Sequence, residues 1–343
     1  MRIQKAILSA FFVFISLLFV NAQAAFELVI LPNNVSTSFR GASVVNDSVA
    51  WVSGSNGWVG KTRDGGETWQ YLQVSQYETF DFRSIYAFDG MNAIIANAGA
   101  PSNILLTNDG GKSWQLVYQL VDDEAFIDGI DFWNDNEGVI YGDPIKGRML
   151  LVRTFDGGKT WSRVSDAQCP QLEVGEASFA ASGTGIRCIN NDKLIIATGG
   201  KQSRLLFTDK NLTAWKNMDT PILQGEATTG IFSFAFSGDQ VGVIVGGDYA
   251  KDTLKVDHVF YTADAGRTWM EPIAPTRGYR ECAEFLNDFI VAAVGPTGID
   301  ISYDYGKSWT PFSDEQGFHL VRKARHGDLV ILAGGKGRVA VLK

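Results

Sequence analysis

The sequence contains few histidines and cysteines, three of each, and this scarcity argues against several kinds of chemistry. The histidines (His258, His319 and His326) have no metal-binding spacing, and there is no C-x-x-C pair, so we expect no metal site and no cofactor. There is also no G-x-G-x-x-G turn for a dinucleotide and no haem-attachment motif. These absences disfavour a redox enzyme.

Three cysteines cannot all pair within one chain. Cys169 and Cys188 flank a long connector that a disulfide would close in an oxidising compartment, whereas Cys282 lies far downstream. The same residues are equally compatible with three buried thiols, and the sequence leaves both possibilities open.

Positive charge is also in short supply. Residues 25–343 hold 28 basic and 38 acidic residues, a formal net charge of −10, because Arg2 and Lys5 belong to the leader described next. Binding to nucleic acid needs a basic face, so we expect no nucleic-acid partner.

Only one long apolar run is present, and it stands at the start of the sequence. Residues 1–24 combine a basic beginning, an apolar stretch from Ala6 to Val20 and the small-x-small end Ala22-Gln23-Ala24. This pattern is typical of a cleaved signal peptide, and the run is shorter than the roughly 18–20 residues of a spanning helix. No cysteine follows it to carry a lipid. We therefore expect a periplasmic or secreted protein that does not span a membrane.

What the sequence does contain is a repeat. Five segments match S/T-x-D-x-G-x-S/T-W, each eight residues long. They begin at Thr62, Thr107, Thr154, Thr262 and Ser302, and their aspartates are Asp64, Asp109, Asp156, Asp264 and Asp304. The interval from Thr154 to Thr262 is about twice the others, which predicts a sixth copy near residue 208. A degenerate copy is present there, Thr208 to Trp215, with Lys210 in the expected place of the aspartate.

The motif has the residues of a tight turn between two antiparallel strands. The aspartate can accept hydrogen bonds from its own turn, the glycine provides an unusual backbone conformation, and the tryptophan begins the next strand. Short strands recur around each copy, four to a unit of about 40–50 residues, which is typical of a β-propeller blade.

Both ends of the chain complete the count. The C-terminal segment reads as three strands, and Phe26–Leu31 reads as a lone strand before the first blade, so together they predict one more blade that closes the ring. We therefore predict an all-β, single seven-bladed propeller over residues 25–343. A six-bladed ring would leave these two segments unexplained. The expected blades are 38–74, 81–119, 125–165, 177–221, 230–273, 278–313, and 317–343 joined by 26–32.

The repeated motif resembles the Asp-box, or BNR, repeat of sialidase-like propellers. Ser36–Trp69 looks like a first blade of the photosystem II stability/assembly factor family, and the later GDP, GGDYAK, GYRE and AVGPTG turns look like its bacterial relatives, which are often labelled "oxidoreductase". The resemblance implies that the Asp boxes are structural. It also implies a non-enzymatic scaffold that holds a membrane-protein partner on an arginine-bearing face, for which Arg40, Arg83 and Arg280 are the matching positions here.

In a four-stranded blade the Asp boxes all lie on one face of the ring, so loops of the other face, around the central channel, are the better place for a functional site. Four inner strands begin with an aromatic residue and a base, and the third blade has an aspartate at that point. The predicted ligand-binding residues are Arg40, Arg83, Asp128, Tyr279, Arg280 and His319. Arginines can bind a carboxylate or phosphate, but each can equally pair with an acid such as Asp81, Glu176 or Glu281.

Two classes of function remain open. The first is a non-catalytic, monomeric binding protein that holds a protein partner or a small anionic ligand on the channel face. The second is a glycoside hydrolase that acts on a carbohydrate with Asp143 and Asp248, or Glu176, as acid and base. However, an aspartate beside glycine or proline more often caps its own turn. The sialidase Phe/Tyr-Arg-Ile-Pro element is also incomplete, because Gly41 and Ala42 follow Phe39-Arg40. We favour binding.

Overall fold

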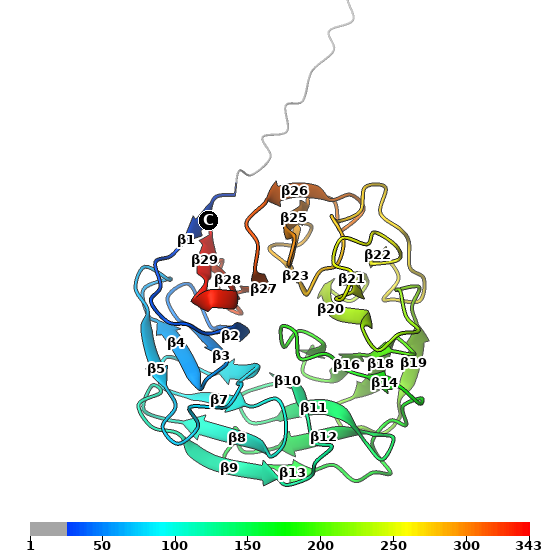
Figure 1. Ribbon diagram of the computed structural model, residues 1–343. Helices are drawn as coiled ribbons and strands as arrows, with labels where there is room; N and C mark the ends of the chain where they lie inside the picture. The colour runs from blue at the N-terminus through cyan, green and yellow to red at the C-terminus, as the bar shows by residue number, and fades with distance from the viewer. Residues whose placement is uncertain (1–25) are drawn as a thin grey trace, which may run out of the picture.

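The computed structural model describes residues 26–343, and the predicted signal peptide at 1–24 lies outside this range. Seven antiparallel sheets are arranged radially around a centre (Figure 1). The predicted all-β, seven-bladed propeller is thereby confirmed.

The first three blades each have four strands in sequential order. Blade 1 consists of β2 (Phe39–Val44), β3 (Ala50–Gly54), β4 (Trp58–Thr62) and β5 (Gln70–Gln73). Blade 2 consists of β6 (Ser84–Ala87), β7 (Ala93–Ala96), β8 (Ser102–Thr107) and β9 (Gln115–Leu120). Blade 3 consists of β10 (Ile127–Phe132), β11 (Gly138–Ile145), β12 (Arg148–Thr154) and β13 (Ser162–Arg163).

Blades 4 and 6 follow the same plan, whereas blade 5 departs from it. Blade 4 consists of β15 (Ile186–Ile189), β16 (Lys193–Ala197), β18 (Arg204–Asp209) and β19 (Lys216–Asp219). Blade 5 has β20 (Thr229–Ser237), β21 (Val241–Asp248) and β22 (Val259–Thr262), extended by the short β14 (Glu176–Ala177) and β17 (Gly199–Gly200). Blade 6 consists of β23 (Cys282–Phe285), β24 (Val291–Gly295), β25 (Gly298–Ser302) and β26 (Thr310–Ser313).

The outer strand of blade 5 is reduced to a single bridge between Tyr261 and Met270. Pro272 and Pro275 follow at once. Because proline has no backbone N–H to donate to a ladder, the strand ends there.

The two ends of the chain form blade 7 together. Its strands are β27 (Phe318–Lys323), β28 (Val330–Gly334), β29 (Val339–Leu342) and β1 (Leu28–Ile30), with a short 3₁₀ turn, Gly335–Gly337, between β28 and β29. Leu28 pairs with Leu342 and Ile30 with Ala340, so β1 pairs antiparallel with the C-terminal strand β29. The predicted ring closure is confirmed.

The core lies between neighbouring sheets. Inner and middle strands are almost wholly buried, as in β3, β7 and β24, whereas the outer strands β5 and β9 alternate between exposed and half-buried positions. This gradient explains why the middle strands read as continuous Ala, Ile and Val runs, because both of their faces meet another blade.

The turns of each blade show which loops share a face. In blade 1 the backbone N–H of Gly65, in the Asp box, donates to the carbonyl of Ser48, in the turn between β2 and β3. The same bond joins Gly110 to Met91 and Gly157 to Asn136 in the next two blades. The Asp boxes and the first turns therefore lie together on one face, the box face, and the opposite loops form the channel face.

Candidate functional site on the channel face

The inner strands carry a β-bulge near the channel face. Pairing skips one residue at Arg40, Asp128, Phe232 and His319 in blades 1, 3, 5 and 7. A bulge bends its strand and re-aims one side chain. These four residues therefore occupy equivalent positions around the channel, as the sequence predicted for three of them.

One connector crosses this end of the channel. Residues 178–185 precede β15, and their backbone and hydroxyls make hydrogen bonds to blades 1, 2, 3, 5 and 6. Arg40 Nη1 donates to the carbonyl of Ala181 (2.9 Å), Ser182 Oγ donates to the carbonyl of Glu281 (3.0 Å), and Thr184 Oγ1 to Ser233 Oγ (2.7 Å). The connector thus closes the mouth that the sequence left open, and it covers the inner-strand ends.

Arg40 belongs to a charge network around Glu281. Its Nη1 lies 2.8 Å from Glu281 Oε2, and His319 Nδ1 lies 3.0 Å from the same oxygen, although the ring is not oriented for a linear hydrogen bond. Burial would raise the pKa of Glu281, but His319 and Arg40 outweigh it and hold that pKa below its ordinary value. A stable carboxylate therefore neutralises much of the basic charge at this point.

Arg83 is the most open of the predicted ligand-binding residues, with about a third of its side chain exposed (32%). Its Nε donates to Asp81 Oδ2 (2.7 Å), and Nη1 lies 3.5 Å from the carbonyl of Ala180 in the connector. Both Arg40 and Arg83 therefore have the acidic partners that the sequence offered as the alternative to ligand binding.

Asp128 is fully buried beneath this surface, and neither carboxylate oxygen has a hydrogen-bond partner among residues 26–343. Burial, reinforced by the nearby Asp143, raises its pKa well above the ordinary value, against the opposing charge of Arg83. Its burial therefore disfavours the charged form of Asp128 relative to an exposed aspartate.

Tyr279 and Arg280 occupy different places from those expected. Gly295 lies against the backbone of Tyr279 and Arg280, just as Gly334 lies against Gly317 and Phe318 in blade 7. Arg280 therefore corresponds to the buried aromatic that precedes each bulge, and Glu281 takes the bulge position.

Both predicted residues of this blade are buried. The guanidinium of Arg280 is fully buried against Asp300, with Nε 2.9 Å from Oδ2. Tyr279 packs edge-on against Phe232, 4.7 Å between ring centres. Neither side chain is accessible to a ligand on the channel face.

An aromatic cluster lies beside the charged network. Phe179 of the connector stacks on Phe232 (3.8 Å between centroids), and Tyr249 packs edge-on against both rings. Tyr249 is half exposed (52%) and begins the long turn between β21 and β22. The sequence analysis missed Phe179, Phe232 and Tyr249 because they come from separate segments that only the ring brings together.

On the opposite face, the Asp boxes share one set of bonds. In the first box Asp64 Oδ1 accepts hydrogen bonds from Thr62 Oγ1 (2.8 Å) and from the backbone N–H of Thr68 (2.9 Å). The Thr68 hydroxyl donates a third hydrogen bond to this carboxylate. Together the three hydrogen bonds lower the pKa of Asp64 to about 2. Gly66 has φ of 91°, and a Cβ there would lie 2.8 Å from Val341 of blade 7, so only glycine lets the box approach the neighbouring blade.

The degenerate sixth box corrects one expectation. Asp209, rather than a residue at the place of Lys210, accepts the bond from the Thr213 backbone N–H (3.1 Å) and also bonds the Thr213 hydroxyl. The Asp-to-Thr spacing is conserved at four residues, but the pair has moved one residue toward the N-terminus relative to Thr208 and Trp215. The hydroxyl of Thr208 is left buried, with no hydrogen-bond partner among residues 26–343.

Comparison with known proteins agrees with this architecture. Residues 20–122 and 98–172 match the model of the family described as photosynthesis system II assembly factor YCF48. The chain is 22% identical over 307 residues to the photosystem II assembly lipoprotein Ycf48 of Synechococcus sp. (strain CC9902), covering 87% of this chain and 82% of the relative.

Two solved structures have the same fold. YCF48 from Cyanidioschyzon merolae has a TM-score of 0.67 at 18% identity and covers 93% of this chain and 98% of that one. YCF48 bound to D1 peptide has a TM-score of 0.65 at 18% identity, over 92% of this chain and 96% of that one.

The chain is similar in sequence and in fold to photosystem II assembly factors. This description agrees with the resemblance drawn from Ser36–Trp69 and the Asp boxes. Within residues 26–343 of this assembly factor-like chain, no helix is long and apolar enough to cross a membrane, and no cluster of three or more His, Cys, Asp or Glu side chains has a metal-binding arrangement. The three cysteines are free thiols.

Each of the three carboxylates considered for glycoside hydrolysis is hydrogen-bonded to groups of this assembly factor-like propeller. Glu176 is buried and bound through both oxygens to Arg204 (2.8 Å each), with Thr198 Oγ1 at 2.7 Å. Asp143 accepts the backbone N–H of Ser178 and so anchors the connector, and Asp248 caps Ala250 in its own turn. These contacts give each carboxylate a structural role and provide no support for hydrolysis.

Proposed function

We propose that this chain is an exported, non-catalytic binding protein that holds a polypeptide partner on its channel face during assembly. The observation that carries the proposal is the closed channel mouth of an assembly factor-like propeller. Because residues 178–185 fill that mouth, the channel face offers a surface for a macromolecule rather than a deep cavity for a small substrate.

The composition of this surface suits a polypeptide. Tyr249 presents an aromatic ring, and Arg83 presents a partly exposed guanidinium. The side chain of Lys251, two residues after Tyr249, is 70% exposed. Tyrosine and arginine are the residues that most often dominate protein–protein interfaces. A structure of the similar YCF48 contains a D1 peptide, which supports a peptide-binding role for the fold.

The roles of the predicted residues follow from their exposure. Arg83 and the outer edges of Arg40 and His319 contact the partner, whereas Asp128, Tyr279 and Arg280 support the surface from below. An anionic group on the partner would have to compete with Asp81 for Arg83, so an anion is secondary to the aromatic contact.

Site-specific photo-crosslinking in the native host tests this function. A photoreactive residue placed at Arg83 or Tyr249 should yield one discrete adduct with a second protein, identified by mass spectrometry. The matched control is Lys159, which lies in the Asp box of blade 3 on the other face. Adducts formed equally at Lys159, or none at the channel face, would contradict the proposal.

A further inference from the structure

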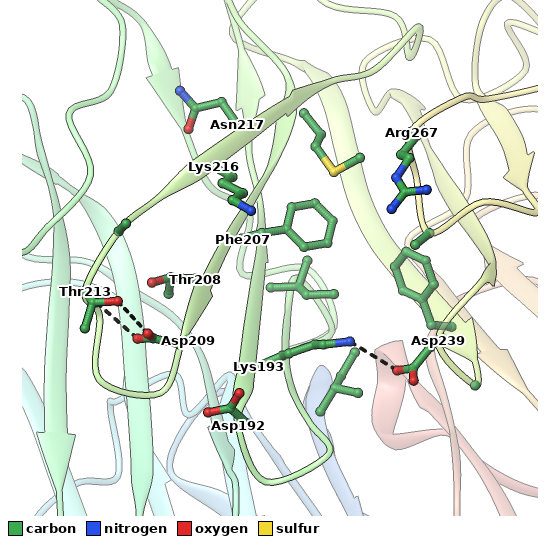
Figure 2. Close-up of a pocket in the computed structure, with 17 residues that line it drawn as sticks. Asp192, Lys193, Phe207, Thr208, Asp209, Thr213, Lys216, Asn217, Asp239 and Arg267 are labelled. Carbon is green, nitrogen blue, oxygen red and sulfur yellow. Dashed lines mark hydrogen bonds and ion pairs between the residues drawn. The ribbon is translucent and has the colours of Figure 1, made fainter.

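A second surface lies on the box face, between blades 4 and 5. A groove with a volume of about 860 Å³ opens there (Figure 2). Its apolar lining comes from both blades and is half-buried or buried: Ile189, Ile195, Phe207, Met218 and Phe236.

In blade 4 the residue that precedes the box threonine has no polar group that could reach the next blade. In blade 1 this residue is Lys61, whose ammonium donates to the carbonyl of Gly110 in the next blade (2.6 Å) and covers the ring of Trp51. In blade 3 it is Arg153, whose guanidinium covers Trp133. Blade 4 has Phe207 instead. A phenyl ring cannot donate a hydrogen bond to the neighbouring blade, so the gap is not closed in this way and the ring remains partly exposed.

Six charged side chains line the groove, three bases and three acids (Lys193, Lys216, Arg267, Asp192, Asp209 and Asp239), so the lining carries no net charge but its two signs are separated. Lys193 and Asp239 pair across the two blades at 3.3 Å, and Asp209 is committed to Thr213 of its box. Lys216 and Arg267 are exposed, and neither side chain makes an ion pair or hydrogen bond with any residue in 26–343. Figure 2 shows both toward one end of the groove, with Asp209 toward the other.

We infer that this groove binds an extended peptide segment of a partner protein in which an apolar or aromatic side chain is flanked by Asp or Glu. The apolar side chain covers the Phe207 and Met218 surface, and the flanking carboxylates pair with Lys216 and Arg267. At the end of the groove that holds Lys216 and Arg267, two unpaired cations lie beside the apolar floor and favour acidic residues of a partner by charge complementarity. This surface lies on the face opposite the one proposed above and does not depend on it.

Fluorescence polarisation with the full chain tests the inference. The probe is a labelled peptide, Gly-Glu-Phe-Glu-Leu-Glu-Gly, and the control probe carries Lys in place of each Glu. We expect saturable binding of the acidic probe, with an affinity that falls as salt is added. The affinity for the Lys probe should be lower by about tenfold or more, because two exposed ion pairs are replaced by repulsion between like charges.

Variants then locate the site. The double variant Lys216→Glu/Arg267→Glu should weaken the acidic probe about tenfold, while its unfolding midpoint stays that of the parent because both side chains are exposed. The matched control, Lys159→Glu, changes the rim of the groove between blades 2 and 3 and should leave binding unchanged. Tyr249→Ala, on the channel face, should also leave it unchanged.

Three results would overturn the inference. They are no saturable binding of the acidic probe, equal binding by the double variant, and equal weakening by Lys159→Glu. Saturable binding of a fatty acid such as laurate without binding of the acidic peptide would also overturn it, because the groove would then take a small amphiphile.

Discussion

The shifted sixth box leads to a stability prediction with an internal control. In an intact box the threonine hydroxyl both donates and accepts: Thr107 Oγ1 donates to Asp109 Oδ1 (2.9 Å) and accepts the backbone N–H of Gly111 (2.9 Å). In the sixth box the equivalent hydroxyl, that of Thr208, is buried and has no partner. The same substitution, threonine to valine, should therefore have different effects at the two positions.

The magnitudes follow from the hydrogen bonds that change. Thr107→Val leaves the buried N–H of Gly111 without an acceptor, which costs about 1–3 kcal/mol of unfolding free energy. Thr208→Val replaces an unsatisfied hydroxyl by a methyl group of the same shape, so we expect no loss of stability and a gain of up to about 1 kcal/mol.

Urea unfolding followed by circular dichroism measures both changes. The midpoint should fall for Thr107→Val and should stay or rise for Thr208→Val, with the slope of the transition unchanged. Asp209→Ala and Lys210→Ala form a companion pair, in which only the aspartate variant should behave like the loss of an intact box. If Thr208→Val costs as much unfolding free energy as Thr107→Val, the conclusion that the Thr208 hydroxyl has no partner is refuted.

Three further outcomes are expected. Arg280→Met should lower the free energy of unfolding by about 3 kcal/mol, because it removes one of the arginines that pair with the buried Asp300. It should not change crosslinking to the partner. A large loss of crosslinking at unchanged stability would contradict a buried, structural role for Arg280. The pKa of the Asp64 and Asp264 carboxyls is about 2, below the unfolded value near 4, so their contribution to stability is complete above about pH 4 and is lost as the pH falls through 2. A pH series of unfolding midpoints checks this, and Asp64→Asn should flatten it. Burial raises the pKa of the Cys169 thiol to about 11, so iodoacetamide at pH 8 should label it only after unfolding, as mass spectrometry would show.

The blade count could be predicted because its signals are local. Each Asp box is a contiguous turn with its own hydrogen bonds, and its spacing reports the length of one blade whatever surrounds it. The lone strand before Phe39 and the three strands of the C-terminal segment sufficed to predict the closure that β1 and β29 make.

The sixth box shows where a sequence alignment fails. Lys210 stands in the aligned place of the aspartate, but a turn can place its hydrogen-bonding pair one residue earlier as long as the spacing from Asp209 to Thr213 is kept. An alignment anchored on Thr208 and Trp215 could not reveal this shift, because the shift depends on the path of the backbone.

The local sequence therefore determined the repeats, the turns and the number of sheets, and the ring determined the site. Aromatic–base pairs looked equivalent at Phe39-Arg40 and Tyr279-Arg280, but a bulge displaced by one residue buries Arg280 and brings Glu281 to the channel face instead. Whether a strand end faces solvent also depends on the 178–185 connector, which comes from another blade. Contacts between residues so distant along the chain exist only once all seven sheets have packed around one axis.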